Sequence, residues 1–376
     1  MADVEYRDRT DTVAKKIQLL QEAHAAGRLD LAMSLADTLR ESIRFERVTR
    51  ARPAAVLPAS HSVRVADLPK PWAEWGRGWT ICKVFQLFET VGRRRDAEPF
   101  EFTVGFNVDE VSDLNREIRV ARVDEKGSLA EIPAQVCDEH RSERTRQCSV
   151  LIAADVPAHG NATFLLFAGN PHAERPDYIS DLQLQGQGYD VNVVNHHYQA
   201  KMSQQSGQLE RLVFARQHGL ELYAGGKGHG EPPGIDWGHD YVDAEHFQKL
   251  RMRNWASVPD FEIETGPIRV RLRRWGFPHS PLHPVFTPSR VHMDVEYSFY
   301  SNQPYFVKQS RFDVIDDVAV AAMRDDEWVF SGYSFTVELW LDKKGKLHEG
   351  AVPPTDYDHL WGVGFVNKTS RDFFLA

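Results

Sequence analysis

The stretch Phe100-Glu101-Phe102-Thr103-Val104-Gly105-Phe106-Asn107-Val108 places an apolar side chain at every second position. Successive side chains of a β-strand point to opposite faces, so this spacing predicts a strand with one buried face. The same alternation recurs beyond Trp72, for example from Leu209 to Phe214 and from Val291 to Tyr300. We find no helical pattern of comparable strength after residue 50 and no repeat of fixed period. The sequence therefore predicts a mainly β protein of the sandwich type.

The first 50 residues have a helical pattern instead. Apolar residues recur at intervals of three or four from Val13 to Leu20, and at intervals of four from Leu31 to Ile43. Gly27 separates the two runs, so the pattern predicts a helical hairpin over residues 1–50. Because the hairpin is short and has charged outer faces, we expect it to pack on the following domain or on a partner subunit, which allows an oligomer.

Proline and glycine divide the rest of the chain. Pro53, Pro58 and Pro69 mark residues 51–71 as a linker. Alternating segments over residues 72–182 predict a small β-sandwich domain, and a glutamine- and glycine-rich bridge opens a second β domain over residues 183–376. A chain of 376 residues is long enough to bury both cores.

Composition excludes some classes of partner. The formal net charge of −9 at pH 7 gives no overall basic field, so no nucleic-acid partner is expected. We find no segment apolar enough to span a bilayer and no secretory signal, so no membrane partner is expected. The three cysteines, Cys82, Cys137 and Cys148, lack metal-binding spacing and predict reduced thiols in a cytoplasmic protein. A pairing of Cys137 with Cys148 across a hairpin remains an alternative.

Residues 223–246 contain six glycines and two prolines, which predicts a long loop. Long structured loops with ionisable groups are more often functional than connecting. The loop carries His229, Glu231, Asp236, Trp237, His239, Asp240 and Tyr241. One hypothesis is that His229, Glu231 and Asp236 hold a divalent metal. The others are acid–base chemistry, which requires no cofactor, and a merely solvated loop.

A second group of such side chains lies in residues 189–202, which we expect to form one arm of a hairpin. In a continuous strand, Asn195 and His197 share one face, whereas His196 and Tyr198 share the other. Valines precede Asn195 on its face, which favours burial of that face, but the alternation alone leaves open which pair faces a cleft.

Two further strands have polar faces. His292, Asp294 and Glu296 alternate and align an imidazole with two carboxylates, which suits sugar binding or acid–base chemistry, or simply an exposed polar face. Residues 269–273 alternate arginine with valine or leucine, which is typical of a solvated strand face. The alternative is that Arg271 binds a sugar carboxylate, to which its forked guanidinium is matched.

The chain lacks the glycine-rich motifs of dinucleotide and nucleoside triphosphate sites, the nucleophile elbow of α/β-hydrolases and the His-Glu-x-x-His motif of zincins. These four chemistries are therefore not expected.

Several segments between residues 185 and 376 form a pattern together. They are Val194-Asn195-His196-His197-Tyr198, the turn Ser206-Gly207-Gln208-Leu209, the loop to Tyr241, Thr265-Gly266-Pro267-Ile268-Arg269, Tyr297-Ser298-Phe299-Tyr300 and Pro304-Tyr305-Phe306. In this pattern the region resembles the large antiparallel supersandwich of galactose mutarotase-like domains and several polysaccharide lyases. The expected fold is thus a large β-supersandwich preceded by a smaller β-sandwich and an N-terminal helical hairpin.

The resemblance implies a concave sheet that binds carbohydrate. Lyases of this shape abstract a proton next to a uronate carboxylate with histidine or tyrosine, while asparagine, arginine or a metal neutralises that carboxylate. The residues expected in catalysis are His197 or His239 as base, Tyr241 or Tyr198 as acid, and Arg253 or Asn195 as neutralising group. The residues expected to bind substrate are Asn195, Trp237, His292 and Arg271, with Trp237 offering a flat face to a sugar ring.

We therefore expect a carbohydrate-active enzyme that performs β-elimination. A glycoside hydrolase would need two carboxylates, for which Glu231 with Asp236 or Asp240 are candidates. A sugar epimerase would use one histidine and one carboxylate. The remaining alternative is a non-catalytic sugar-binding or assembly subunit whose helical hairpin docks a partner.

Overall fold

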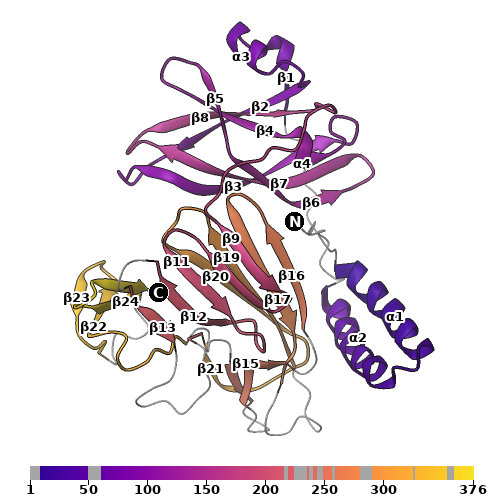
Figure 1. Ribbon diagram of the computed structural model, residues 1–376, viewed down its shortest axis with the longest axis vertical. Coiled ribbons are helices and arrows are strands. Elements are labelled where there is room, and N and C mark those ends of the chain that lie inside the picture. The colour runs from indigo at the N-terminus through magenta and orange to yellow at the C-terminus, as the bar shows by residue number, and fades with distance from the viewer. Residues whose placement is uncertain are drawn as a thin grey trace.

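The structure, a computed structural model, describes residues 9–49, 61–215, 219–223, 235–236, 240–243, 249–255, 259–279, 290–324, 327–353 and 360–376. The described residues form antiparallel β-sheets that follow two N-terminal helices, which confirms the mainly β fold of the sandwich type. Figure 1 shows two β units stacked along the long axis, with the helices beside the second unit.

The N-terminal helices are α1 (Arg9–Ala25) and α2 (Leu29–Thr49), and they form the expected hairpin. Gly27 turns the chain between them with a φ of +69°, in the left-handed region that favours glycine. The small residues Ala23 and Ala32 are buried where the two helices meet. Lys16 Nζ lies 2.8 Å from Asp260 Oδ2, an ion pair that joins the hairpin to the second β unit.

The first β unit consists of two facing sheets. One sheet has the order β1 (Val63–Arg64), β2 (Ile81–Phe88), β8 (Asn161–Ala168), β4 (Arg119–Val123) and β5 (Leu129–Ile132). The other has the order β3 (Arg95–Asn107), β7 (Thr145–Val156) and β6 (Ala134–Arg141). Three short helices complete the unit: η1 (Val65–Asp67), α3 (Lys70–Trp75) and α4 (Leu114–Glu117). Apolar side chains from both sheets form one core between them.

Residues 100–108 lie almost entirely in β3, and the predicted alternation is confirmed from Phe102 to Phe106, whereas Phe100 is 37% exposed. Val104 and Phe106 are buried in the core between the sheets, whereas Glu101 and Asn107 are exposed. Residues 63–71 differ from the expected linker. They form β1, η1 and the start of α3, because Val65 packs with Phe167 in a small separate core.

The three cysteines are buried free thiols, so Cys137 and Cys148 do not pair. Cys137 lies opposite Ser149 in the β6–β7 register. Because side chains alternate along β7, the neighbouring Cys148 points to the other face, into the core.

The second β unit also has two facing sheets. One has the order β13 (Glu221–Tyr223), β12 (Leu209–Phe214), β11 (Tyr198–Met202), β10 (Asp190–Val194) and β9 (Gln183–Gln187). The other has the order β16 (Asp260–Thr265), β17 (Arg269–Gly276), β19 (Val291–Tyr300) and β20 (Phe306–Val314). Their inner faces share one core that includes Val193, Met202 and Phe299.

Two smaller sheets extend the second unit. One has the order β18 (Pro278–His279), β15 (Lys249–Trp255), β14 (Asp240–Asp243) and β21 (Val320–Arg324). The other has the order β23 (Leu347–Glu349), β22 (Val337–Asp342), β24 (Leu360–Asn367) and β25 (Asp372–Leu375), and its Phe374 belongs to the shared core. Among the described helices, none has the length and apolarity required to cross a membrane.

Candidate functional site

Two residues of the glycine-rich segment, Ile235 and Asp236, bind to the core of the second unit. The backbone N–H groups of Ile235 and Asp236 both donate to the carbonyl of Leu209, each at 3.1 Å. The carbonyl of Ile235 accepts from Val329 N at 2.8 Å, and Asp236 forms an isolated β-bridge with Trp328. Ile235 is fully buried and Asp236 is 2% exposed. The loop is therefore fixed to the sandwich core at this point.

The carboxylate of Asp236 is held by two side chains of the core. Lys308 Nζ lies 2.7 Å from it, and the phenol of Tyr297 donates a hydrogen bond to it. Lys308 Nζ also lies 5.4 Å from the ring centroid of Trp328, within the range of a cation–π contact. Tyr297 and Lys308 are cross-strand neighbours on the inner faces of β19 and β20. These contacts make Asp236 an anchor, so its expected role as a metal ligand is not supported.

The remaining candidates of the loop are placed less fully. His229, Glu231, Trp237 and His239 lie outside the described residues. Tyr241 lies in β14, opposite Leu250 of β15 and Met323 of β21, and Arg253 lies further along β15. The backbone thus brings Tyr241 and Arg253 onto adjacent strands, and their side chains lie outside the described part of the structure.

Residues 195–197 form a turn between β10 and β11 rather than part of one strand. Asn195 Oδ1 accepts from the backbone N–H groups of His197 and Tyr198, and its Nδ2 donates to the carbonyls of Tyr300 and Gln303. A buried asparagine that makes these four hydrogen bonds stabilises a turn and has no free group for a substrate. The expected alternation of faces is therefore wrong at this position.

The turn separates the side chains that were expected to act together. Tyr198 is buried in the core and donates to the carbonyl of Tyr305 at 3.2 Å. Burial raises the pKa of its phenol, so it is a poor proton donor as well as an inaccessible one. His197 is exposed, and His196 is exposed beside Asp181. Of this group, only the histidines are accessible to a ligand.

His292, Asp294 and Glu296 lie on one face of β19, as the alternation predicted. His292 is buried, and its ring packs edge-on against Phe277 at 5.2 Å between centroids. Asp294 accepts two hydrogen bonds from Arg273, at 2.8 and 2.6 Å. These contacts give the face a packing role and leave His292 inaccessible for sugar binding.

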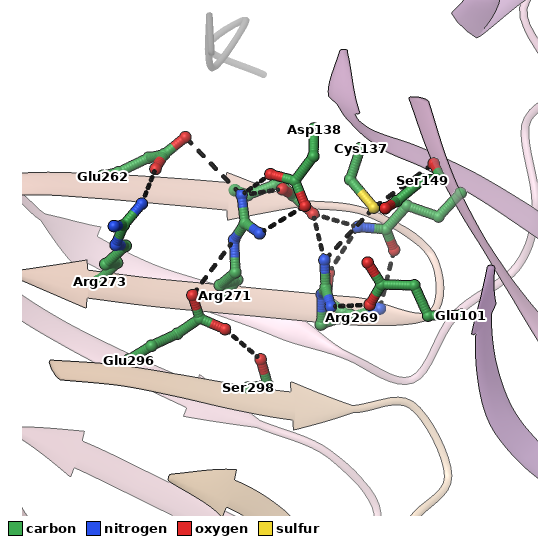
Figure 2. Close-up of polar contacts among 12 residues, drawn as sticks. Glu101, Cys137, Asp138, Ser149, Glu262, Arg269, Arg271, Arg273, Glu296 and Ser298 are labelled. Carbon is green, nitrogen blue, oxygen red and sulfur yellow. Dashed lines mark hydrogen bonds and ion pairs between the residues drawn. The ribbon is translucent and has the colours of Figure 1, made fainter. Parts of the chain in front are cut away.

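The arginine row of β17 is largely buried rather than solvated, because it lies where the two β units meet (Figure 2). Arg271 donates two hydrogen bonds to Asp138 of β6, at 2.9 and 2.7 Å, and lies 2.8 Å from Glu264. Arg269 donates to Glu101 of β3 at 2.6 Å and to the sulfur of Cys137 at 3.3 Å. Bidentate pairs of this kind are strong and directional. Arg271 therefore joins the two units and is not available to a sugar carboxylate.

The electrostatics of this junction favour charged arginines. Burial alone would lower the pKa of Arg271, but hydrogen bonding to Asp138 and the charge of Glu264 outweigh it and raise that pKa. Burial raises the pKa of the Cys137 thiol, which keeps it protonated. Ligand atoms of Glu101, Cys137 and Asp138 lie within 4.8 Å of one another. Because Arg269 pairs with Glu101, Arg271 pairs with Asp138 and the Cys137 thiol stays protonated, this cluster is an ion-pair network and is unsuited to a metal.

Sequence reasoning missed several of the residues that organise these sites. Lys308 was detectable, because a lysine that alternates with Phe306 and Phe312 on the apolar face of a strand requires a buried partner. Gln135 and Asp138 carried no such signal, since their partners lie more than 120 positions away, as in the Gln135–Glu264 and Asp138–Arg271 contacts.

No protein-family model matches this chain, and no curated protein is similar to it in sequence.

Proposed function

We propose that this protein is a carbohydrate-active enzyme that cleaves uronate-containing oligosaccharides by β-elimination. The observation that supports this best is the buried anchor of the glycine-rich loop. Removing an aspartate and a lysine from water costs several kcal/mol per ion before their attraction offsets it. A loop that only connects two strands does not require a buried ion pair. A loop that holds reactive groups requires a fixed position, which such a pair provides.

The reaction requires three groups on or next to the anchored loop. A base removes the proton from the carbon next to the uronate carboxylate, a double bond forms, and an acid protonates the departing oxygen of the glycosidic bond. We assign the base to His239, three positions after the anchor, and the acid to Tyr241. Arg253, on the strand beside Tyr241, neutralises the carboxylate, and Trp237 stacks on the sugar ring. His197 is the alternative base.

Elimination is preferred over hydrolysis because of Asp236. A glycosidase needs two carboxylates that reach the scissile bond. Asp236 is buried and ion-paired with Lys308, so it does not supply one of them. Only Glu231 with Asp240 would remain for a hydrolase. The free thiols support a reducing compartment, and we place the enzyme in the cytoplasm.

The proposal is tested by incubating the full chain with a panel of uronate-containing and neutral oligosaccharides, with and without a chelator. Elimination leaves an unsaturated uronate with an ultraviolet absorbance, whereas hydrolysis leaves new reducing ends without it. We expect the absorbance with uronate substrates only, and unchanged by the chelator. Reducing ends without the absorbance would indicate a hydrolase. Loss of product formation in the presence of the chelator would support a metal bound by His229 and Glu231.

A second candidate, an assembly subunit, is favoured by one observation on the helical hairpin. Among the described residues, the hairpin belongs to none of the three core clusters. It nevertheless exposes several large apolar side chains: Ile17, Leu19, Leu29, Leu31, Met33 and Ile43. If this is the main role, the chain shows no turnover on any member of the panel, and it sediments as an oligomer.

A further inference from the structure

The sheet β23–β22–β24–β25 carries a rigid turn at one end. Asp342 Oδ1 accepts from the backbone N–H groups of Lys344 and Lys346, at 2.8 and 2.9 Å. Its other oxygen is hydrogen-bonded to His348 Nε2 at 3.0 Å. Gly345 has a φ of +75° and donates to the Asp342 carbonyl. These contacts fix the backbone of residues 342–346.

Trp361 of β24 is held against this turn, yet its side chain faces solvent. Its indole Nε1 donates to the carbonyl of Lys343 at 3.2 Å, and the residue is 75% exposed. The hydrogen bond satisfies the one polar atom of the ring and holds the ring in place. Trp361 therefore offers a fixed apolar surface to the solvent, where a ring of this size gains little from packing within the chain.

The turn that accepts this hydrogen bond carries three lysines. Lys343, Lys344 and Lys346 are all exposed, and within the described part of the chain none of them forms an ion pair with an acidic side chain. The one carboxylate of the turn, Asp342, is directed at His348 and at backbone N–H groups. The turn thus presents three cations and one fixed aromatic face. Aromatic faces suit the C–H surface of a sugar ring, and lysines suit its carboxylate.

The same sheet exposes two further apolar side chains. Leu341 and Leu347 are cross-strand partners on this sheet and both are exposed. Leu341 lies opposite Gly362 of β24. Figure 1 shows β22, β23 and β24, in yellow, on the opposite side of the second unit from the helical hairpin, so the hairpin of the same chain does not cover them.

We propose that Trp361 and the lysines at 343, 344 and 346 form an accessory binding site for an acidic oligosaccharide. The site shares no residue with the anchor at Asp236, and it would hold one segment of a uronate chain. This inference rests on the proposed function for its ligand class, since a carboxylated sugar is the substrate proposed there. An anionic lipid surface would use the same charges, and the test distinguishes the two.

The test is titration of the full chain with a uronate oligosaccharide and with a neutral oligosaccharide of equal length, followed by calorimetry. Trp361→Ala should weaken binding of the acidic ligand by about tenfold, the size expected for loss of an aromatic contact. Trp361→Phe keeps a ring and should retain most of the affinity. A triple substitution of Lys343, Lys344 and Lys346 by Gln should weaken the acidic ligand and leave the neutral one unchanged.

Tyr333→Ala is the matched control, because Tyr333 is an aromatic residue of similar exposure outside the 342–346 turn. Equal effects of Trp361→Ala and Tyr333→Ala, or none from either, would overturn the site. Loss of binding to anionic lipid vesicles in Trp361→Ala, with oligosaccharide binding intact, would overturn the sugar ligand. Turnover of a short substrate is measured in the same samples. Its complete absence would refute the proposed reaction, whereas the binding result would stand.

Discussion

Lys308 and Asp236 illustrate how two residues fix one point of the chain in the core. Lys308 comes from the inner face of β20, and Asp236 is the point where the glycine-rich loop enters the core. A buried ion pair contributes little net stability compared with apolar residues, but losing one partner leaves the other charge unpaired in the core. The pair therefore specifies the position of Asp236 in the core more than it stabilises the fold.

Asp236→Ala should destabilise the protein strongly, because Lys308 stays buried without its counter-ion. We expect a loss of about 3–5 kcal/mol in the free energy of unfolding, measured by denaturant titration. Adding Lys308→Met should recover part of this loss. The control is Asp190→Ala, which removes an exposed ion pair with Lys201 and should cost less than about 1 kcal/mol. Equal losses for Asp236→Ala and Asp190→Ala would contradict the anchor.

Glu89 provides a pH-dependent test in the first unit. Burial would raise the pKa of its carboxyl, but hydrogen bonds from the backbone N–H groups of His159, Val91, Gly92 and Arg93 outweigh it and lower the pKa to about 2. A lowered pKa stabilises the folded state above the unfolded value of 4.5, and this stabilisation disappears as the pH falls toward about 2.

The melting temperature of the wild type should therefore fall more steeply between pH 4.5 and about 2 than that of Glu89→Gln. Thermal unfolding followed by circular dichroism at several pH values measures the difference between the two slopes. Equal slopes for wild type and Glu89→Gln would show that Glu89 is not responsible for the pH dependence of the melting temperature. The exposed variant Glu74→Gln serves as the comparison.

At the scale of elements, the β16–β17 turn shows how the two units are joined. Gln135 of β6 accepts from the backbone N–H groups of Ile268 and Arg269, and donates to Glu264 and to the carbonyl of Arg269. Gly266 allows this approach, since a Cβ there would lie 2.1 Å from the Gln135 side chain. The side-chain amide of Gln135, in the first unit, thus forms hydrogen bonds with backbone groups of the β16–β17 turn in the second unit.

Gly266→Ala should displace Gln135 and destabilise the junction by about 1–3 kcal/mol, as expected for overpacking. In a Gln135→Ala background the same change should cost much less, because the side chain it displaces is gone. A double-mutant cycle on unfolding free energies measures this coupling. Additive effects would mean that the two residues do not interact as the structure indicates.

Two strands were predicted correctly from the sequence. The strands expected at 209–214 and 291–300 coincide with β12 and β19, because side-chain alternation is a local property. The turn at residues 195–197 was not predicted, since Asn195 is fixed by carbonyls of Tyr300 and Gln303, more than 100 positions away. A strand can be predicted from the alternation of neighbouring residues, whereas a turn that is fixed by distant residues cannot.

At the scale of the whole molecule, the sequence predicted a helical hairpin followed by two β units but not how they meet. The arginines of β17 looked solvated because alternation reveals which residues share a face and not what covers it. The first unit covers that face through Glu101, Gln135 and Asp138. The same contact engages Arg271 with Asp138 and so removes it from the residues expected to bind substrate.

The central claim is that the loop anchored at Asp236 carries an eliminating base. Its most direct test is the initial rate at which unsaturated uronate forms with wild type, His239→Ala and the exposed control His196→Ala on one uronate oligosaccharide. We expect His239→Ala to lower this rate by about 10²–10⁴-fold, the usual contribution of a general base, and His196→Ala to keep the wild-type rate. Equal rates for wild type and His239→Ala, or no unsaturated product from any of the three, would contradict it.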